Sequence, residues 1–363
     1  MTRASPPLLL HVFSTFAIGG PQVRFATVAN RLGPAFRHAV VAMDGRLEAR
    51  ALLDPRLDIA FPEVSIVKGD SWRNLRSFRA LLRGMRPDLL VTSNWGTIEW
   101  AIARRGLGLR HLHAEDGFGP EESAQQIPRR VLARRLLLRS ATVVLPSHVL
   151  WRIAREAWRL PEARLRLVPN GVDLARFPAR TASAPCGDPP VIGTVAALRP
   201  EKNIGRLVRA FALLPASLPA RLVIVGDGPE RREVEALAAT RGLTDRILFT
   251  GHAADPASHY RGFDLFALSS DTEQMPLSLL EAMATGLPVA ATDIGDVRAM
   301  LSEANRPQIV PRSDEDLAAA LATLVADADL RRRLGAANRC RAEEHYSLDR
   351  MVEAWRRLFA GLD

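Results

Sequence analysis

Cysteine is almost absent from this chain of 363 residues, since only Cys186 and Cys340 occur and they lie far apart. Two isolated thiols give neither a disulfide framework nor the ligand spacing of a zinc site, and they are typical of a reducing compartment. No cluster of His, Cys and acidic residues has metal-ligand spacing, and no apolar run is long enough to span a bilayer. We therefore predict a protein without a metal, a disulfide or a transmembrane helix.

Lysine is equally scarce, because only Lys68 and Lys202 stand among the 49 basic residues. Residues 1–180 hold 28 Lys and Arg against 15 Asp and Glu, so the basic excess behind the net charge of +9 lies in this half. Much of it falls in residues 129–166, where Arg alternates with Leu and Trp. Such a surface can attract an anionic membrane. A pI of 10.8 also admits nucleic acid, and an ordinary solvated helix face is the third interpretation.

We favour a membrane surface or an anionic acceptor over nucleic acid. The protein is then expected in the cytoplasm, either free or peripheral on the cytoplasmic face of the membrane.

Apolar runs of strand length alternate with helical stretches along both halves of the chain, a pattern typical of parallel α/β sheets. The predicted strands are 8–13, 39–42, 88–92, 111–113, 142–145, 165–168, 191–196, 222–225, 247–250, 265–268 and 288–291. Helices are expected between them, for example over 22–32 and 72–85. The segment 177–190 is rich in Pro, Ala and Ser and reads as a linker. We predict two doubly wound domains with a cleft between them, in which ligands bind at the carboxyl ends of the strands.

The segment E-Q-M-P-L-S-L-L-E places Glu273 and Glu281 on either side of a predicted helix start. If Pro276 is the first helical residue, the helix ends at Thr285 and its N-cap is Met275. Met has no side-chain acceptor, so the free amides of the first turn are open to an external anion. This arrangement suggests a phosphate site flanked by two acids. In the alternative interpretation Glu281 is a core-edge acid paired with an Arg, and Glu273 is a solvated loop residue.

Other turns at predicted strand ends could also approach phosphate. Gly19 and Gly20 follow the first strand, and Gly226 follows the strand at 222–225. Lys202 follows another strand, as a compact point charge in an Arg-rich chain. Tight turns need glycine without any ligand, and Lys202 could equally be a surface residue. No G-x-G-x-x-G fingerprint with a downstream acid is present, which argues against a dinucleotide dehydrogenase.

Six segments occur in an order that resembles the family 4 retaining glycosyltransferases of the GT-B fold. They are L-V-P-N-G-V-D (167–173), A-L-R-P-E-K-N (197–203), I-V-G-D-G-P (224–229), F-T-G-H (249–252), S-S-D-T-E-Q-M-P-L-S-L-L-E-A-M-A-T-G-L-P-V (269–289) and the Arg-rich C-terminal helices. The resemblance implies two Rossmann-like domains facing a central cleft. Residues 1–170 would bind the acceptor, residues 171–345 the nucleotide-sugar donor, and the helix in 346–363 would return to the N-terminal domain.

The resemblance also implies roles for individual residues. Glu281 would hold the ribose hydroxyls of the donor and Glu273 the hydroxyls of the transferred sugar, while Lys202 would neutralise the departing diphosphate. The remaining donor contacts would come from Gly19, Gly20, Arg199, Gly226, Gln274, Met275, Pro276 and Leu277. Oxocarbenium-like transfer with a diphosphate leaving group depends on stabilising that charge, which this set can supply without a metal or other cofactor.

Two positions depart from the family pattern. Ala197 stands where an Arg is usual, and Arg199 could replace it. The usual catalytic His of the N-terminal domain has two candidates, His113 and Asp116. The expected activity is retaining transfer of a sugar from a UDP- or GDP-sugar to a glycan or lipid-linked acceptor, in cell-surface polysaccharide or lipopolysaccharide biosynthesis. A sugar-nucleotide epimerase and a catalytically degenerate nucleotide-sugar-binding protein are the alternatives.

Overall fold

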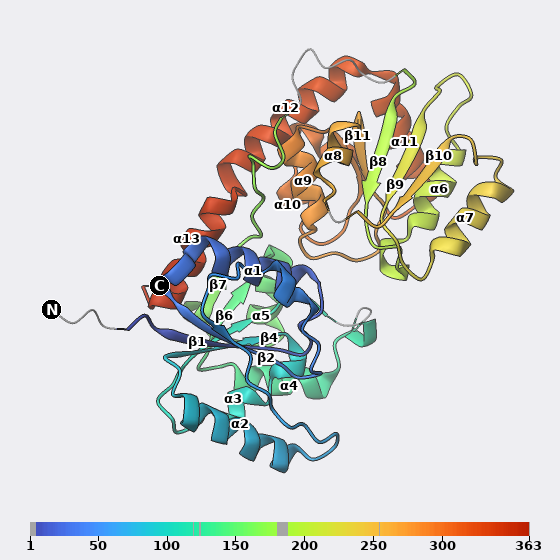
Figure 1. Ribbon diagram of the computed structural model, residues 1–363. Helices are drawn as coiled ribbons and strands as arrows, with labels where there is room; N and C mark the ends of the chain where they lie inside the picture. The colour runs from blue at the N-terminus through green and yellow to red at the C-terminus, as the bar shows by residue number, and fades with distance from the viewer. Residues whose placement is uncertain (1–4, 119, 123–124, 180–187, 254, 363) are drawn as a thin grey trace. The chain divides into compact units, whose positions relative to one another are not determined.

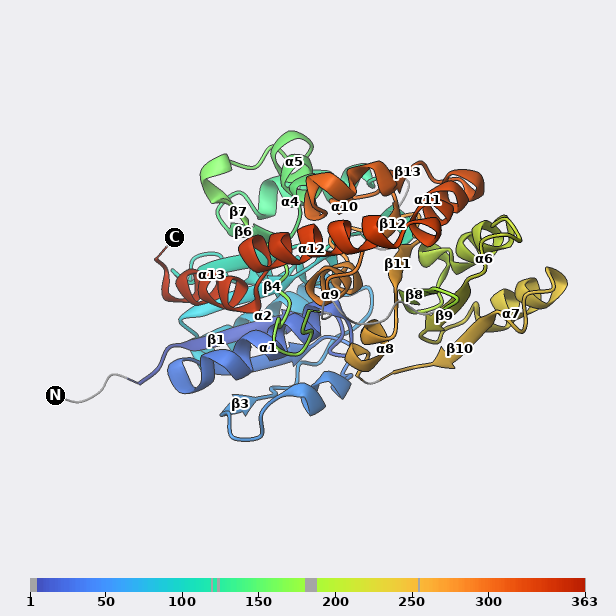
Figure 2. The ribbon, with the colours of Figure 1, turned by 90° about the horizontal axis from the view of Figure 1, so that it is seen from above.

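The computed structural model describes residues 5–118, 120–122, 125–179, 188–253 and 255–362. The chain forms two compact units, which we call the N-terminal unit (residues 1–169 and 351–363) and the C-terminal unit (residues 170–350). Each unit is a parallel sheet covered by helices (Figures 1 and 2).

The N-terminal unit contains a seven-stranded parallel sheet of order β3-β2-β1-β4-β5-β6-β7. Its strands are β1 (Leu8–Phe13), β2 (Arg37–Ala42), β3 (Ile59–Ala60), β4 (Leu89–Ser93), β5 (Arg110–Ala114), β6 (Thr142–Leu145) and β7 (Leu165–Leu167). Its helices are α1 (Gly20–Leu32), α2 (Ser71–Met85), α3 (Trp100–Ala103), α4 (Pro128–Leu137), α5 (His148–Glu156) and most of α13 (Leu348–Ala360). Short 3₁₀ turns are η1 (Gly33–Ala35), η2 (Glu48–Leu52), η3 (Trp95–Thr97), η4 (Pro120–Glu122) and η5 (Glu162–Arg164). The strand order reverses between the neighbouring strands β1 and β4, so the switch point of the sheet lies at the carboxyl ends of these two strands.

Strand β1 shows why the apolar runs are continuous rather than alternating. Leu10 and Val12 point into the cluster that contains Phe78 of α2, whereas Phe13 points to the opposite face and packs with Phe25 of α1. A strand covered by helices on both faces has no solvent side, so both alternating sets of side chains are apolar.

The C-terminal unit contains a six-stranded parallel sheet of order β10-β9-β8-β11-β12-β13. Its strands are β8 (Val191–Val195), β9 (Arg221–Val225), β10 (Ile247–Gly251), β11 (Leu265–Leu268), β12 (Val289–Thr292) and β13 (Ile309–Val310). Its helices are α6 (Ile204–Ala212), α7 (Arg231–Thr240), α8 (Ala257–Arg261), α9 (Leu277–Thr285), α10 (Val297–Met300), α11 (Asp314–Ala326) and α12 (Ala328–His345), with η6 (Pro200–Lys202) and η7 (Glu303–Gln308). Leu265 and Phe266 of β11 lie in different core clusters, so this sheet is also covered on both faces.

The predicted doubly wound α/β fold is therefore confirmed for both units, and each predicted strand is present with ends within two residues of those expected. Strands β3 and β13 were not predicted, because a two-residue strand has no hydrophobic period to read.

The predicted linker 177–190 differs from the structure at its first residue. Phe177 is buried in the C-terminal unit, with its ring 5.6 Å from that of Tyr260. The boundary between the units along the chain instead follows Pro169. Residues 180–187, which include Cys186, lie outside the described part of the chain, and Cys340 is an exposed free thiol.

Candidate functional site

The predicted site residues fall into two groups, one in each unit. The donor group in the C-terminal unit lies at the carboxyl ends of β8, β9 and β11 and includes the start of helix α9. The group in the N-terminal unit lies at the carboxyl ends of β1 and β5, where the chain enters the next helix or loop.

Helix α9 begins at Leu277, one residue later than predicted. Pro276 is its N-cap, because its ψ of 125° is extended while its φ of −67° would suit either conformation, and no side chain caps the helix. The expected cap, Met275, is instead buried, and its Sδ accepts a hydrogen bond from the Asn170 amide at 3.2 Å. The predicted end is confirmed, since Gly286 adopts the left-handed conformation (φ 78°) that closes the helix after Thr285.

The N-cap residue Pro276, like the predicted Met275, offers the start of α9 no side-chain oxygen as an acceptor. The first amides of a helix have no partner within it, and the macrodipole makes this end partly positive. The turn that precedes the helix carries Glu273, and Glu281 lies one turn inside it.

Glu273 and Lys202 form an ion pair beside this helix start. Their side chains are only 11% and 19% exposed, and Ser270 Oγ also donates to Glu273 Oε1 at 3.2 Å. Glu273 is therefore a fixed, partly buried acid rather than a solvated loop residue. Lys202 ends η6, and the left-handed Asn203 that follows it caps α6 by accepting from the Arg206 amide at 3.0 Å.

Arg199 lies three residues before Lys202 but is placed differently. Its side chain is 56% exposed and its Nε lies 3.2 Å from Glu201 Oε1. The structure thus brings Lys202 to Glu273 and leaves the Arg199 guanidinium on a neighbouring acid.

Glu281 is partly buried, and among the described residues its side chain accepts a hydrogen bond from a tyrosine rather than pairing with an Arg. The hydroxyl of Tyr260 in α8 donates to Glu281 Oε2 at 2.7 Å. Burial raises the pKa of Glu281 from its ordinary value of 4.5 to about 7, against the opposing effects of the Tyr260 hydrogen bond and the Arg176 charge. A carboxyl that titrates near neutrality is unusual for a merely structural acid.

Two glycines shape the backbone around this site. A Cβ on Gly226 (φ 141°) would lie 1.9 Å from the Ala196 carbonyl oxygen, so Gly226 allows the ends of β8 and β9 to meet. A Cβ on Gly295 (φ 49°) would lie 2.0 Å from the Glu273 carbonyl oxygen and 3.1 Å from that of Gln274. The loop after β12 therefore supports the turn that carries Glu273, a contact that nothing in the sequence D-I-G-D indicates.

In the N-terminal unit, α1 starts at Gly20 with Gly19 as its N-cap and no side-chain cap. A Cβ on Gly20 would meet nothing within 4 Å, whereas one on Gly19 would lie 2.9 Å from the Gln22 side chain. This end of the helix is therefore also open to an anion.

The two candidates for the usual His position have different surroundings. His113 on β5 is completely buried and lies 2.8 Å from the Thr92 hydroxyl, inside the sheet. Asp116 follows the end of β5, its side chain is 12% exposed, and the Arg24 guanidinium binds both of its carboxylate oxygens. Its amide donates to Asn94 Oδ1 at 2.7 Å. Of the two, only Asp116 can be reached from solvent.

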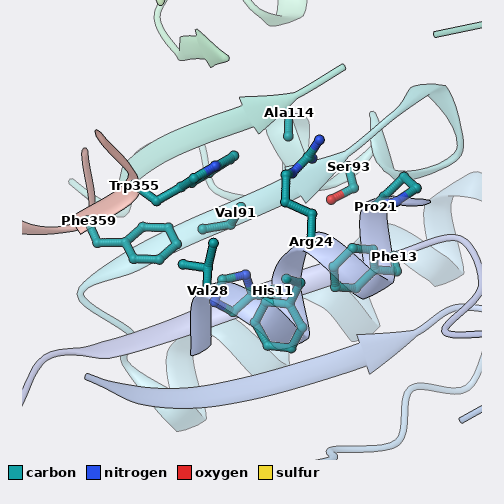
Figure 3. A pocket seen from close by; sticks show the side chains of 11 residues that line it. His11, Phe13, Pro21, Arg24, Val28, Val91, Ser93, Ala114, Trp355 and Phe359 are labelled. Carbon is teal, nitrogen blue, oxygen red and sulfur yellow. The ribbon is translucent and has the colours of Figure 1, made fainter. Parts of the chain in front are cut away.

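A narrow cavity of about 20 Å³ lies beside Arg24 in the N-terminal unit, with room for roughly one water molecule. Trp355 and Phe359 of α13 line it together with His11 of β1 (Figure 3). The Arg24 guanidinium also lies 5.4 Å from the centre of the Trp355 ring. The last helix thus completes the side of the unit on which Arg24 lies.

The basic surface predicted in residues 129–166 includes α4. Leu132 and Leu136 are 55% and 60% exposed, one helical turn apart, and Arg129 and Arg135 are exposed beside them. Among the described helices, none has the length and apolar character to cross a membrane. The described residues also contain no group of three His, Cys, Asp or Glu side chains arranged as around a metal ion.

Residues 18–176 match the model of Glycosyltransferase Family 4, and residues 177–341 match the model of Glycosyl transferases group 1. The putative glycosyltransferase EpsF of Bacillus subtilis is 30% identical over 325 residues, which is 80% of each chain. N-acetyl-alpha-D-glucosaminyl L-malate synthase of Bacillus anthracis is 30% identical over 162 residues, but the match spans only 42% of that relative and 44% of this chain.

Solved structures agree in fold. The HepE protein of Anabaena in complex with UDP and glucose superimposes with a TM-score of 0.82 over 98% of this chain and 100% of that one, at 17% identity.

Proposed function

Because the chain belongs to the family 4 glycosyltransferases and is therefore a glycosyl-transferring enzyme of the GT-B fold, we propose that it moves a sugar from a UDP- or GDP-sugar to a glycan or lipid-linked acceptor with retention of configuration. The pathway we propose is the synthesis of a cell-surface polysaccharide or lipopolysaccharide. The observation that carries the donor part is the Lys202–Glu273 pair beside the uncapped start of α9.

The proposed mechanism assigns the diphosphate to Lys202 and the first amides of α9. A hydrogen bond to a charged group contributes about 1.5–3 kcal/mol, so an ammonium and two amides can stabilise the leaving group by several kcal/mol. Glu273 then exchanges its lysine partner for hydroxyls of the transferred sugar, and Glu281 accepts from the ribose hydroxyls. No step in this scheme requires a metal, since the developing charge is met by protein donors.

In the N-terminal unit we assign Asp116 rather than His113 to the acceptor. Asp116 is accessible and held by Arg24, whereas a buried His113 cannot contact a substrate without disrupting β5. A carboxylate held in place by a guanidinium can accept a hydrogen bond from an acceptor hydroxyl. Asp116→Asn is expected to lower transfer about 100-fold, the range associated with one positioned acid-base group, with nucleotide affinity unchanged.

The first experiment is calorimetric titration with UDP and GDP, followed by turnover with a panel of nucleotide sugars. Lys202→Met should weaken binding of the diphosphate roughly tenfold or more. Full binding and turnover by Lys202→Met would contradict the assignment. Product analysis without acceptor separates the epimerase alternative, since an epimerase changes the free nucleotide sugar. Binding without any turnover would indicate the degenerate binding protein.

The acceptor side includes a proposed membrane contact through α4. Exposed Leu132 and Leu136 can enter the lipid interface while the neighbouring Arg side chains meet anionic headgroups. The protein should float with phosphatidylglycerol vesicles at low salt, and Leu132→Glu with Leu136→Glu should abolish this. Exposed Leu248 of β10 in the other unit supplies the matched control, Leu248→Glu. Equal flotation of all three proteins would contradict the contact.

A further inference from the structure

The hydroxyl of Tyr260 donates a hydrogen bond to the Glu281 carboxylate. We propose that Tyr260 is a positioning residue for donor binding, which fixes one oxygen of the Glu281 carboxylate so that the other faces the ribose diol of the nucleotide. This inference rests on the proposed function, in which Glu281 binds that diol.

The geometry of the pair leaves Glu281 Oε1 without a hydrogen-bond partner among the residues that the structure describes. The Tyr260 hydroxyl is 2.7 Å from Glu281 Oε2 and 3.1 Å from the Ser278 carbonyl oxygen. A phenol has one proton to donate. While Glu281 is ionised, the phenol donates its proton in a hydrogen bond to the carboxylate. If Glu281 takes up a proton, the phenol can instead donate to the Ser278 carbonyl oxygen. The hydroxyl therefore distinguishes the two protonation states of Glu281.

The aromatic ring that carries this hydroxyl is fixed on several sides. Tyr260 is completely buried. It meets Phe177 edge to face with 5.6 Å between ring centres, and Phe263 at 5.7 Å, while Phe266 stacks on it at 5.8 Å. Because these contacts involve the ring and not the hydroxyl, Tyr260→Phe removes the hydrogen bond and keeps the packing.

The charges around Glu281 come from several elements. Arg176 and Asp255 form an ion pair at 2.9 Å, and they respectively favour and oppose ionisation of Glu281. From α12, Arg339 pairs with Glu343 and donates to the Ala284 carbonyl at the far end of α9.

Burial raises the pKa of the Tyr260 phenol well above its ordinary value, so the phenol stays protonated as a donor. Its hydrogen bond lowers the pKa of Glu281, while burial acts in the opposite direction. Loss of the hydroxyl is then expected to shift Glu281 ionisation to higher pH.

The chain has two tyrosines, which supplies a matched control. Tyr346 is also buried in the C-terminal unit, but its hydroxyl lies 3.3 Å from the Ala299 carbonyl. UDP and GDP affinity is to be measured by calorimetry from pH 6 to 9 for the wild type, Tyr260→Phe and Tyr346→Phe. We expect wild-type affinity to fall below about pH 7, as Glu281 takes up a proton. Tyr260→Phe should bind roughly tenfold more weakly at pH 7 and recover at pH 9, whereas Tyr346→Phe should match the wild type.

A spectroscopic measurement keeps the test independent of how Tyr260→Phe folds. After incorporation of 3-fluorotyrosine, Tyr346→Phe leaves a single ¹⁹F resonance, that of Tyr260. Its chemical shift should titrate with Glu281 and should cease to do so in Glu281→Gln.

These outcomes distinguish a failure of the inference about Tyr260 from a failure of the proposed function. A flat Tyr260 resonance, or a nucleotide affinity and pH profile that Tyr260→Phe leaves unchanged, would overturn the inference while Glu281→Ala still abolishes binding. If the wild type binds neither UDP nor GDP, or if Glu281→Ala binds as tightly as the wild type, the proposed function itself fails.

Discussion

Replacing Glu281 by glutamine is expected to stabilise the ligand-free protein at alkaline pH while it removes nucleotide binding. Glutamine has the shape of the protonated acid and its carbonyl can still accept from Tyr260. The pKa of Glu281 is raised by burial to about 7 in the folded protein. A carboxyl with a raised pKa favours folding at acid pH, and this stability is lost as the pH rises from about 4.5 through 7.

The size of the effect follows from the same shift. At 1.36 kcal/mol per pKa unit, a rise from 4.5 to about 7 corresponds to about 3 kcal/mol at most, and partial exposure of Glu281 reduces it to about 2–3 kcal/mol. In a unit of this size 1 kcal/mol moves the melting temperature by roughly 2–4 °C. Glu281→Gln should therefore melt roughly 5–10 °C above the wild type at pH 8.5 and at nearly the same temperature at pH 5.

The assay is thermal unfolding of the C-terminal unit by calorimetry, at several pH values and without nucleotide. Glu233→Gln supplies the control, because it makes the same charge change at an exposed position of α7 and should show no such pH dependence. A difference between Glu281→Gln and the wild type that is the same at pH 5 and 8.5 would refute the reasoning. In that case the pKa of Glu281 would not be raised in the folded protein, and ionisation of Glu281 would not destabilise the C-terminal unit.

Three further predictions concern other parts of the two units. Glu273→Gln releases Lys202 for the diphosphate, so UDP or GDP should bind several-fold more tightly by calorimetry while sugar transfer falls; weaker binding would show that the pair helps to form the site. Gly295→Ala places a Cβ against the Glu273 carbonyl and should lower donor affinity. The control Gly242→Ala has a similar φ but open space around it, so it should cost only backbone strain of about 1 kcal/mol in thermal melts. Equal effects of the two substitutions on donor affinity would contradict a supporting role for Gly295. Burial lowers the pKa of His38 to about 4, which should cost the N-terminal unit about 2–3 kcal/mol between pH 7 and 4. Hydrogen exchange in β2 should report a smaller loss in His38→Leu than in the wild type, because buried His11, whose pKa is also lowered by burial, remains; an equal loss in both proteins would contradict this.

The sheets and helix α9, with its start to within one residue and its end at Thr285, could be predicted from sequence because their signals are local. A buried parallel strand is a short apolar run, and Pro276 and Gly286 mark the two ends of a helix by their backbone preferences. The one-residue error at Pro276 arose because proline fixes φ and leaves ψ free.

The partners of the site residues could not be predicted in the same way. Tyr260 and Glu281 lie on separate helices with β11 between them in the chain, and their contact depends on how α8 and α9 pack. His113 and Asp116 are three residues apart, yet their surroundings differ. His113 is buried on β5, whereas Asp116 follows the end of that strand and is partly exposed. Only the register of β5 and the place where it ends decide which of them is accessible.

The position of α13 also bears on how the protein is made. Phe359 packs on His11, with 5.8 Å between ring centres, so the last helix belongs to the core of the unit that is translated first. Residues 170–350 must be synthesised before that helix exists, which takes roughly 10–35 s at 5–20 residues per second. During this interval His11 and its apolar neighbours lack their cover, and the nascent chain offers a surface that a chaperone can bind. A truncated N-terminal unit expressed alone should therefore aggregate unless residues 351–363 are supplied, for example as a fused segment.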